Sequence, residues 1–366
     1  MDNYKIHEKY MKIAINLAKK GAGKVNPNPM VGAVIVKENK IIGMGYHERY
    51  GEAHAEVNAI NSATESVENA TMYVTLEPCS HYGKTPPCVE LIIKNKIKTC
   101  IIGMKDPNLL VAGNGILKLK EAGITIIVGI LEEKVVKLNS IFIKYIQTKI
   151  PYVFLKTAIT LDGKIATREG DSKWISNKIA REKVQKLRNK YHSIMIGVNT
   201  VLNDDPQLTA RIKNGSDPYR IVVDPNLRIK EELNIIKNNY DNKTIIVTSN
   251  KNINTEKYNN LLNLGIKFIN MDGVKFNIKD IIVEIGKLNI DSILIEGGSY
   301  LISKSIEEKV IDKGIIFIAP KIVGDNNAIA FINGREIYKM KESLILKNPR
   351  YKKYGNNIAI KFNGVV

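Results

Sequence analysis

Cysteine is scarce in this chain, and long apolar runs are missing from it. There are 3 cysteines among 366 residues, which fits a reducing compartment. No run of about 18 apolar residues occurs, as a membrane-spanning helix would need. The first residues follow a polar amphipathic pattern without the apolar core of a signal peptide. We therefore expect a cytoplasmic protein that does not cross a membrane.

Two common nucleotide-binding motifs are also missing. The fragment at residues 113–115 lacks the third glycine of a Gly-x-Gly-x-x-Gly fingerprint, and no Gly-x4-Gly-Lys-Ser/Thr phosphate loop occurs. An apolar run at residues 292–295 does lead into Gly297 and Gly298. Backbone N–H groups at a helix start after such a turn suit an anion. An ordinary strand-to-helix turn is the more common explanation of this pattern.

The charge balance is strongly positive. Lysine and arginine number 55 against 37 acidic residues, which gives a net charge of +18 at pH 7. Such an excess can indicate a nucleic-acid partner. The lysines are spread along the whole chain, however, and form no block interleaved with aromatic residues. We attribute the charge to a general compositional bias, with phosphorylated small substrates as a second contributor.

Length and apolar spacing predict two α/β domains. In the first half, the spacing predicts helices over residues 6–17, 53–60, 89–96 and 115–122 and strands over residues 30–36, 41–46, 72–76, 99–103 and 124–128. This alternation is typical of a three-layer α/β domain. A long helical pattern over residues 132–149 ends at Pro151, so we place the boundary between domains 1–150 and 151–366.

The second half alternates in the same way. The pattern predicts strands over residues 152–158, 193–197, 220–224, 244–248, 267–270 and 292–295, and helices over residues 177–190 and 278–287 and from Ser299. Residues 234–263 are rich in asparagine and lysine, and we expect a poorly constrained surface there. No internal repeat is visible.

The strongest chemical signal is a set of zinc ligands. His54 and Glu56 form a His-x-Glu at a predicted helix start, and Pro78-Cys79 and Cys88 follow. This order is typical of zinc deaminases. One imidazole and two thiolates leave a fourth zinc position for water, whose pKa falls to about 7. Glu56 is placed to carry protons rather than to bind metal.

Each of these residues has an ordinary interpretation as well. A lone histidine near a helix start is usually a cap or a surface residue, and a lone cysteine is usually a small buried hydrophobe. Cys79 and Cys88 are separated by eight residues instead of the usual two. The joint occurrence of His54, Glu56, Cys79 and Cys88 nevertheless favours a zinc site over separate ordinary roles for these residues. Cys100 lies in a strand-like run, and we interpret it as structural.

Longer motifs resemble a known family over nearly the whole chain. Residues 26–32 (NPNPMVG), 51–56 (GEAHAE) and 75–88 (TLEPCSHYGKTPPC) are similar to the bifunctional deaminase-reductases of riboflavin biosynthesis (RibD type). The separation of the two cysteines is this family's own. The resemblance implies an N-terminal cytidine-deaminase-like three-layer α/β/α domain with one Zn²⁺ per chain.

The second half resembles the reductase part of the same family. The matching motifs are residues 156–158 (KTA), 161–166 (LDGKIA), 170–176 (GDSKWIS), 197–201 (GVNTV), 204–209 (DDPQLT) and 296–298 (EGG). The resemblance implies a dihydrofolate-reductase-like α/β domain, which binds NADPH without a Gly-x-Gly-x-x-Gly loop. Thr160 and Pro225 stand where serine is common in the family. Because Pro225 has no hydroxyl, we do not count it as a site residue.

The resemblance also implies the reactions. The substrate is 2,5-diamino-6-ribosylamino-4(3H)-pyrimidinone 5′-phosphate, which is deaminated and then reduced by NADPH from a ribosyl to a ribityl compound. The implied deaminase pocket contains Asn28, His47 and Lys84, with Lys84 directed toward the substrate phosphate. The implied reductase substrate site contains Ser172, Arg188, Leu208, Arg211 and Glu296. The implied dinucleotide site contains Ala158, Trp174, Thr200, Asp204, Gly298, Ser299, Tyr300, Leu301, Ile302, Ser303 and Lys304.

Lys156 and Asp204 are our catalytic candidates for sugar opening and proton transfer. Their ordinary interpretations are a strand-end lysine and a helix-capping aspartate. Two other functions stay open. One is a zinc deaminase of nucleic acid or nucleosides with a basic accessory domain. The other is a single-activity enzyme whose second half only supports assembly. We expect a homo-oligomer that acts on a small molecule and binds neither nucleic acid nor membrane.

Overall fold

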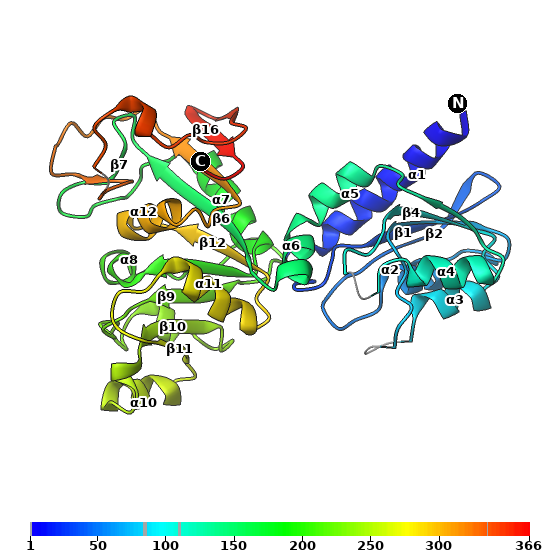
Figure 1. Cartoon of the computed structure of the whole chain (residues 1–366), viewed down its shortest axis with the longest axis horizontal. Helices are drawn as coiled ribbons and strands as arrows, with labels where there is room; N and C mark the ends of the chain where they lie inside the picture. Colours follow the sequence, from blue (N-terminus) through cyan, green and yellow to red (C-terminus); the bar gives the residue numbers. More distant parts are fainter. Residues whose placement is uncertain (1, 83–85, 109–110, 335) are drawn as a thin grey trace. The chain divides into compact units, whose positions relative to one another are not determined.

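The chain divides into two compact units, Met1–Lys149 and Ile150–Val366, in a computed structural model (Figure 1). The structure describes residues 2–82, 86–108, 111–334 and 336–366. The division lies next to the predicted boundary at Pro151. Within the described residues, no helix is long and apolar enough to span a membrane.

The first unit contains a five-stranded sheet with the strand order β2-β1-β3-β4-β5. Its strands are β1 (Gly32–Lys37), β2 (Lys40–Tyr46), β3 (Thr71–Leu76), β4 (Thr99–Met104) and β5 (Thr125–Val128). β1 is antiparallel to β2 and β3, whereas β3, β4 and β5 are parallel. Loops that follow parallel strands leave from the same edge of a sheet. The loop after β3, which carries Cys79, therefore emerges beside the loop after β4.

Helices cover both faces of this sheet. They are α1 (Asp2–Ala18), α2 (Ala55–Asn61), α3 (Cys88–Lys94), α4 (Asn114–Glu121), α5 (Glu132–Leu138) and α6 (Ser140–Thr148), with a short 3₁₀ turn η1 (Lys19–Gly21). Figure 1 shows α1 and α5 on one face and α2, α3 and α4 on the other. This confirms the predicted three-layer α/β/α architecture.

Two glycines of β2 let α2 approach the sheet closely. A Cβ atom at Gly45 would lie 2.3 Å from the backbone nitrogen of Ala59 and 2.5 Å from the carbonyl oxygen of Ala55. A Cβ atom at Gly43 would lie 2.3 Å from the carbonyl oxygen of Ala59. Only glycine permits this spacing, because any side chain there would collide with helix backbone. The position of α2, which begins right after His54, thus depends on these two residues.

The prediction of one helix over residues 132–149 is wrong. The segment forms α5 and α6, and Asn139 lies between them with a backbone outside the helical region. The buried side chain of Asn139 accepts a hydrogen bond from the Met30 nitrogen at 2.9 Å and donates one to the Met30 oxygen at 3.1 Å. Asparagine favours such side-chain bonds to backbone over a helix interior. The break therefore fixes the end of the loop that carries Asn28.

The second unit contains a nine-stranded sheet with the order β11-β10-β9-β8-β12-β6-β13-β16-β15. The first seven strands in this order are parallel, and β16 and β15 continue the sheet in antiparallel pairing. The strands are β6 (Tyr152–Ile159), β8 (Ser193–Gly197), β9 (Tyr219–Val223), β10 (Thr244–Ser249), β11 (Lys267–Met271), β12 (Ser292–Glu296), β13 (Lys313–Ile318), β15 (Arg350–Tyr354) and β16 (Asn357–Phe362). A separate ribbon pairs β7 (Lys164–Ala166) with β14 (Ile329–Ala330).

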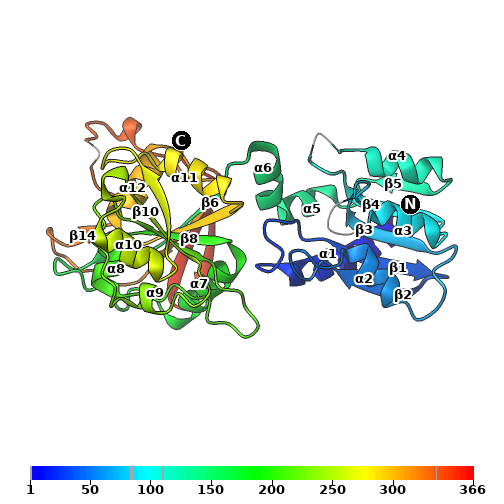
Figure 2. The same cartoon turned by 90° about the horizontal axis from the view of Figure 1, so that it is seen from below.

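Helices lie on both faces of the second sheet as well (Figure 2). They are α7 (Lys178–Lys190), α8 (Val198–Asp204), α9 (Asn234–Lys237), α10 (Glu256–Asn263), α11 (Ile278–Lys287) and α12 (Ser299–Glu307), with the 3₁₀ turns η2 (Asn250–Asn252) and η3 (Met340–Glu342). On β6, Val153 and Leu155 belong to a core cluster that also contains apolar residues of α11 and α12. Phe154, which points to the other face, contacts the ring of Tyr191 just after α7 at 4.9 Å between centroids. α11 and α12 therefore cover the face of β6 that carries Val153 and Leu155, and α7 covers the opposite face.

The prediction of a poorly constrained surface over residues 234–263 is wrong. This segment contains α9, β10 and α10, and every residue of β10 is buried between β9 and β11. Buried Arg220 of β9 bonds to Asp241 and Asn239 and fixes the turn before β10. The predicted strand at residues 244–248 is confirmed as β10, whereas α9 and α10 were not predicted, because asparagines and lysines outnumber the apolar residues that these helices bury.

We predict that Gly45→Ala destabilises the first unit by about 1–3 kcal/mol, the usual cost of overpacking a well-packed site. Unfolding can be followed in denaturant through release of zinc from this unit. Met44→Ala is the matched control, because its side chain is 48% exposed, and we expect a change within about 0.5 kcal/mol. An equal effect of both substitutions would show that the close contact of α2 does not govern stability.

Candidate active sites

Three potential metal ligands converge at the edge of the first sheet. His54 Nδ1 lies 3.3 Å from Cys88 Sγ and 3.5 Å from Cys79 Sγ, and the three ligand atoms all lie within 4.8 Å of one another. His54 is the N-cap of α2, Cys88 is the first residue of α3, and Cys79 lies in the loop after β3. One imidazole and two thiolates in this arrangement fit a zinc ion with an open fourth position.

The electrostatics of the cluster favour a metal-binding thiolate. The pKa of Cys79 is lowered to about 4, chiefly by the hydrogen bond from the Cys88 thiol, with burial opposing and His54 adding to the effect. The backbone N–H of Cys88 also donates to Cys79 Sγ at 3.3 Å. Because the thiolate is the form that binds metal, Cys79 is prepared for coordination.

Glu56 lies in the same site but is not one of the three ligands. Its side chain is buried, and Oε2 has no hydrogen-bond partner among the residues that the structure describes. Burial raises the pKa of Glu56 to about 7, although His54 acts in the opposite direction. A carboxyl group with a pKa near neutrality can both accept and donate protons. The unpartnered oxygen therefore fits proton exchange with a molecule bound at the cluster.

The structure brings two of the three expected deaminase pocket residues to this cluster. Asn28 Nδ2 lies 3.2 Å from His47 Nε2, and His47 Nδ1 lies 3.1 Å from the carbonyl oxygen of Ala53. A neutral His47 that donates from Nδ1 and accepts at Nε2 satisfies both bonds, and burial lowers its pKa accordingly. The rings of His47 and His54 meet edge to face at 5.5 Å. Lys84 lies outside the described residues.

A further residue of this site, Glu77, had no assigned role from its sequence. Its buried carboxylate accepts four backbone N–H groups, from Asp106 at 3.1 Å, Gly113 at 3.0 Å, Gly115 at 3.0 Å and Ile116 at 3.2 Å. Glu77 thereby ties the loop that carries Cys79 to the start of α4. The sequence signal was a charged residue directly after an apolar strand and two positions before a ligand.

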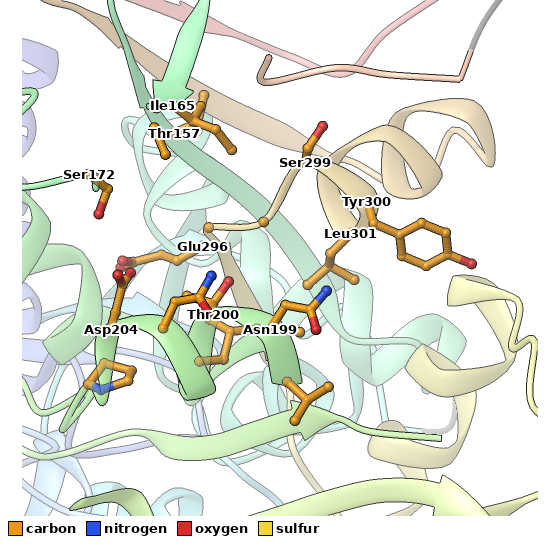
Figure 3. Close-up of a pocket in the computed structure, with 18 of the residues that line it drawn as sticks. Thr157, Ile165, Ser172, Asn199, Thr200, Asp204, Glu296, Ser299, Tyr300 and Leu301 are labelled. Atoms are coloured by element: carbon orange, nitrogen blue, oxygen red, sulfur yellow. The ribbon is translucent and has the colours of Figure 1, made fainter. Parts of the chain in front are cut away.

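The second unit contains a cavity of about 1220 Å³ at the carboxyl ends of β6, β8, β9 and β12 (Figure 3). Ligands of open α/β sheets usually bind at this edge. The expected substrate-site residues all line the cavity: Ser172, Arg188, Leu208, Arg211 and Glu296. The expected cofactor residues that line it are Ala158, Trp174, Thr200, Asp204, Gly298, Ser299, Tyr300, Leu301, Ser303 and Lys304. The side chain of Ile302 is instead buried in the hydrophobic core.

A buried ion triad forms one wall of the cavity. Arg188 donates to Glu296 from Nε at 3.2 Å and from Nη2 at 3.0 Å, and Lys156 Nζ lies 3.6 Å from Glu296 Oε2. Burial alone would raise the pKa of Glu296, but Arg188 and then Lys156 lower it to about 2. The carboxylate therefore stays ionised. Two cations against one carboxylate leave excess positive charge, which suits an anionic ligand.

The Gly-Gly turn opens the cavity wall to a cofactor. Gly297 and Gly298 have φ values of 63° and 70°, and Cβ atoms on them would lie 3.2 Å from side-chain atoms of Thr200. The hydroxyl of Ser299, the first residue of α12, is buried and has no partner among the described residues. Backbone N–H groups and this free hydroxyl at a helix start fit a dinucleotide phosphate. The Gly-Gly turn can therefore bind a phosphate of NADPH although the chain has no Rossmann fingerprint.

Asp204 is the last residue of α8, a helix that the sequence pattern did not predict. It is therefore not an N-cap, and its carboxyl faces the cavity (Figure 3). Burial raises the pKa of Asp204, and Asp171 adds to this, while Lys173 and a hydrogen bond with Ser172 oppose it. Lys156 lies inside β6 rather than at its end. The ordinary interpretations of both residues are thus weakened.

The fold and the two sites define a two-unit enzyme that joins a zinc-dependent deaminase to a reductase. Residues 4–104 match the cytidine and deoxycytidylate deaminase zinc-binding region, and residues 151–360 match the RibD C-terminal domain. The chain belongs to the RibD family, the bifunctional deaminase-reductases of riboflavin biosynthesis, and uses Zn²⁺ and NADPH.

Relatives match over almost the full length. The riboflavin biosynthesis proteins RibD of Actinobacillus pleuropneumoniae and Aquifex aeolicus are each 42% identical, covering 96% and 98% of this chain and 94% and 98% of their own. A RibD structure from Acinetobacter baumannii superposes with a TM-score of 0.90 at 36% identity, covering 99% of both chains. A Thermotoga maritima structure superposes with a TM-score of 0.87 at 38% identity and the same coverage. The likeness therefore includes both units.

We predict that Cys88→Ser lowers the zinc content of the purified protein from about one per chain to a small fraction, because a serine hydroxyl replaces a thiolate ligand. Elemental analysis after dialysis measures this directly. Cys100→Ala is the matched control, since Cys100 is buried in β4 and is not part of the cluster. Full zinc occupancy in Cys88→Ser would remove Cys88 from the ligand set.

We predict that Glu77→Gln weakens zinc binding about 10–100-fold, as the loss of a group that orients a ligand typically does. The amide nitrogen cannot accept hydrogen bonds, so backbone donors near the Cys79 loop lose their partner. Competition with a chromophoric chelator measures the zinc dissociation constant. Glu121→Gln, at the exposed far end of α4, should leave it unchanged. Unchanged affinity in Glu77→Gln would mean that the loop holds its position without this carboxylate.

Proposed function

We propose that the first unit deaminates 2,5-diamino-6-ribosylamino-4(3H)-pyrimidinone 5′-phosphate and that the second unit reduces the deaminated product. The observation that carries this proposal is the convergence of His54, Cys79 and Cys88 beside the buried carboxyl of Glu56, whose Oε2 has no partner among the described residues. The Thermotoga maritima structure bears the name diaminohydroxyphosphoribosylaminopyrimidine deaminase/5-amino-6-(5-phosphoribosylamino)uracil reductase. Its similarity supports the same substrate for this chain.

In the deaminase unit, Glu56 carries out the proton transfers. Zinc, when bound by the three ligands, supplies the Lewis acidity that makes water a nucleophile at neutral pH. Glu56 accepts a proton from the attacking water and delivers a proton to the departing 2-amino group, which leaves as ammonia. A pKa of about 7 suits both steps. Asn28 and His47 hold the pyrimidine ring, and Lys84 is our candidate for binding the substrate phosphate.

In the reductase unit, the cavity wall activates the sugar. NADPH, when bound, supplies the hydride that reduces C1′. Glu296 fixes Arg188 and Lys156, and their excess positive charge attracts the phosphorylated sugar. Lys156 and Asp204 move protons as the ribose ring opens. The Gly298 turn, Thr200 and the free hydroxyl of Ser299 hold the cofactor phosphates, and Trp174 and Tyr300 contribute cavity surface.

The remaining expectations concern the compartment, the oligomeric state and the binding partners of the enzyme. We infer a cytoplasmic homo-oligomer that acts on a small phosphorylated pyrimidine and does not bind nucleic acid. Light scattering measures the oligomeric state. RNA binding that weakens steeply with salt would instead favour a nucleic-acid deaminase with a basic accessory unit.

We predict that the two activities can be removed separately. Glu56→Gln should keep its zinc and lose about 10²–10⁴-fold in deamination, yet still reduce deaminated substrate supplied from outside. Asp204→Ala should lose about 10²-fold or more in NADPH oxidation, yet accumulate the deaminated ribosylamino compound. Chromatography of the reaction products and NADPH absorbance measure both activities.

The control for this experiment is Glu65→Gln, an exposed carboxylate of the first unit that should leave both activities unchanged. Zinc content and circular dichroism establish that each variant is folded. Loss of both activities from Asp204→Ala in a folded, zinc-loaded protein would show that the sites are coupled, and near-normal deamination by Glu56→Gln would assign the proton transfer to another group.

A further inference from the structure

Four lysines from three elements gather on one face of the second unit, away from its cavity. We call this set, Lys183 and Lys190 of α7, Lys352 of β15 and Lys361 of β16, the lysine face. Figure 1 and Figure 2 both show α7 close to the β15–β16 hairpin. Lys183 interacts electrostatically with Lys352 and Lys361, and Lys190 interacts with Lys183, so the four side chains lie in one region.

Strand register fixes the direction of the two sheet lysines. Lys361 is opposite Arg350 and Lys352 is opposite Ala359, and Ala359 and Lys361 are two residues apart on β16. Directly opposite residues and residues two apart share one face of a sheet. Phe362, the neighbour of Lys361, lies in the core cluster with α11 and α12. Lys352 and Lys361 therefore point to the face on which α7 lies.

Helical spacing fixes the direction of the two α7 lysines. Lys183 and Lys190 are seven residues apart, about two turns, so they lie on the same side of the helix. Arg181 and Arg188, which line the cavity, occupy a different side of α7. The lysine face and the cavity thus use separate surfaces of this helix.

The four lysines differ from other surface lysines of this unit in their partners. Among the described residues, no carboxylate forms an ion pair with any of its four lysines, whereas Lys287 and Lys304 elsewhere pair with neighbouring glutamates at 2.6 and 2.8 Å. Burial and then Lys183 and Lys313 lower the pKa of Lys190 to about 8. Lys352 and Lys361 instead rest over the ring of Tyr354, at 5.5 and 5.9 Å from its centroid.

A lysine-rich composition does not explain this arrangement. Composition alone scatters lysines over exposed positions, where water solvates each charge at little cost. Here three partly buried lysines, Lys183, Lys190 and Lys361, lie near exposed Lys352, and bringing like charges together costs free energy unless an opposite charge neutralises them. No carboxylate among the described residues pairs with these lysines, which suggests a neutralising group from outside the chain.

We propose that the lysine face binds a multivalent phosphate anion, at a site separate from both active sites. Several ammonium groups converging from a helix and two strands match a ligand with several negative oxygens more closely than a single carboxylate. The ammonium groups of Lys352 and Lys361 lie over the ring of Tyr354, which attracts them weakly but offers no anionic oxygen. A free polyphosphate and the phosphate chain of a nucleotide share this chemistry.

The test is isothermal titration of zinc-loaded, NADPH-saturated protein with inorganic tripolyphosphate and, separately, with ATP at constant ionic strength. NADPH fills the cavity so that the probes cannot bind there. Zinc content is measured after the titration, because both probes bind metals and could remove the zinc. We expect K183Q/K361Q to weaken binding about tenfold or more, whereas K183R/K361R keeps both charges and should retain binding. K237Q/K279Q removes the same charge from exposed positions elsewhere in this unit and should bind as the parent protein does.

The two probes identify the source of the anion. Equal affinities would assign recognition to the phosphate chain alone, and tighter binding of ATP would add the nucleoside; both support the site. The proposal is overturned if neither anion binds or if K237Q/K279Q weakens binding as much as K183Q/K361Q. Deamination and reduction are unaffected by these outcomes, so the proposed function is tested independently.

Discussion

A buried carboxylate at the end of a parallel strand holds each active site together. In the first unit, Glu77 follows β3 and accepts four backbone N–H groups from the residues that lead into α4. In the second unit, Glu296 ends β12 and binds Arg188 and Lys156. A carboxylate removed from water is stable only when several donors surround it. Each glutamate therefore fixes the loops or side chains around it.

The positions of the zinc ligands depend on Glu77 and on the close packing of α2. The ligands come from three places that are distant in sequence: the start of α2, the loop after β3 and the start of α3. Gly43 and Gly45 set the depth of α2, and Glu77 sets the position of the loop. The ligand atoms converge because the backbone around them is anchored by close packing and by charge-assisted hydrogen bonds. Glu56, the second residue of α2, then reaches the same space.

The reductase cavity depends on charge in a different way. Lys156 comes from a strand and Arg188 from a helix, and both contact Glu296. The ionised glutamate orients both cations while leaving one positive charge in excess at the wall. Because the adjacent Gly-Gly turn exposes backbone N–H groups and the Ser299 hydroxyl, two kinds of anion can bind side by side. This arrangement suits a phosphorylated sugar and a dinucleotide phosphate in one cavity.

Sequence reasoning reached the architecture and the chemical motifs but not the residues that position them. The three-layer first unit followed from apolar spacing and the Zn²⁺ site from the His-x-Glu and cysteine motif, whereas the NADPH requirement followed only from the resemblance to a known family. The break at Asn139 was missed, because helical periodicity continues through it and only the distant Met30 explains the buried amide. Glu77 was missed for the same reason: its partners lie about 30–40 residues away and become neighbours only in the fold. The strands β15 and β16 escaped prediction because lysines interrupt their alternation, and β13, a short apolar run, was also missed.

The central claim is that one chain carries two consecutive reactions on one pyrimidine. The most direct measurement incubates the purified protein with 2,5-diamino-6-ribosylamino-4(3H)-pyrimidinone 5′-phosphate, with and without NADPH, and identifies the products by mass spectrometry. The account predicts that the deaminated ribosylamino compound accumulates without NADPH and that its ribityl derivative forms when NADPH is present. Reduction of the sugar with the 2-amino group still in place, or no deamination without NADPH, would contradict it.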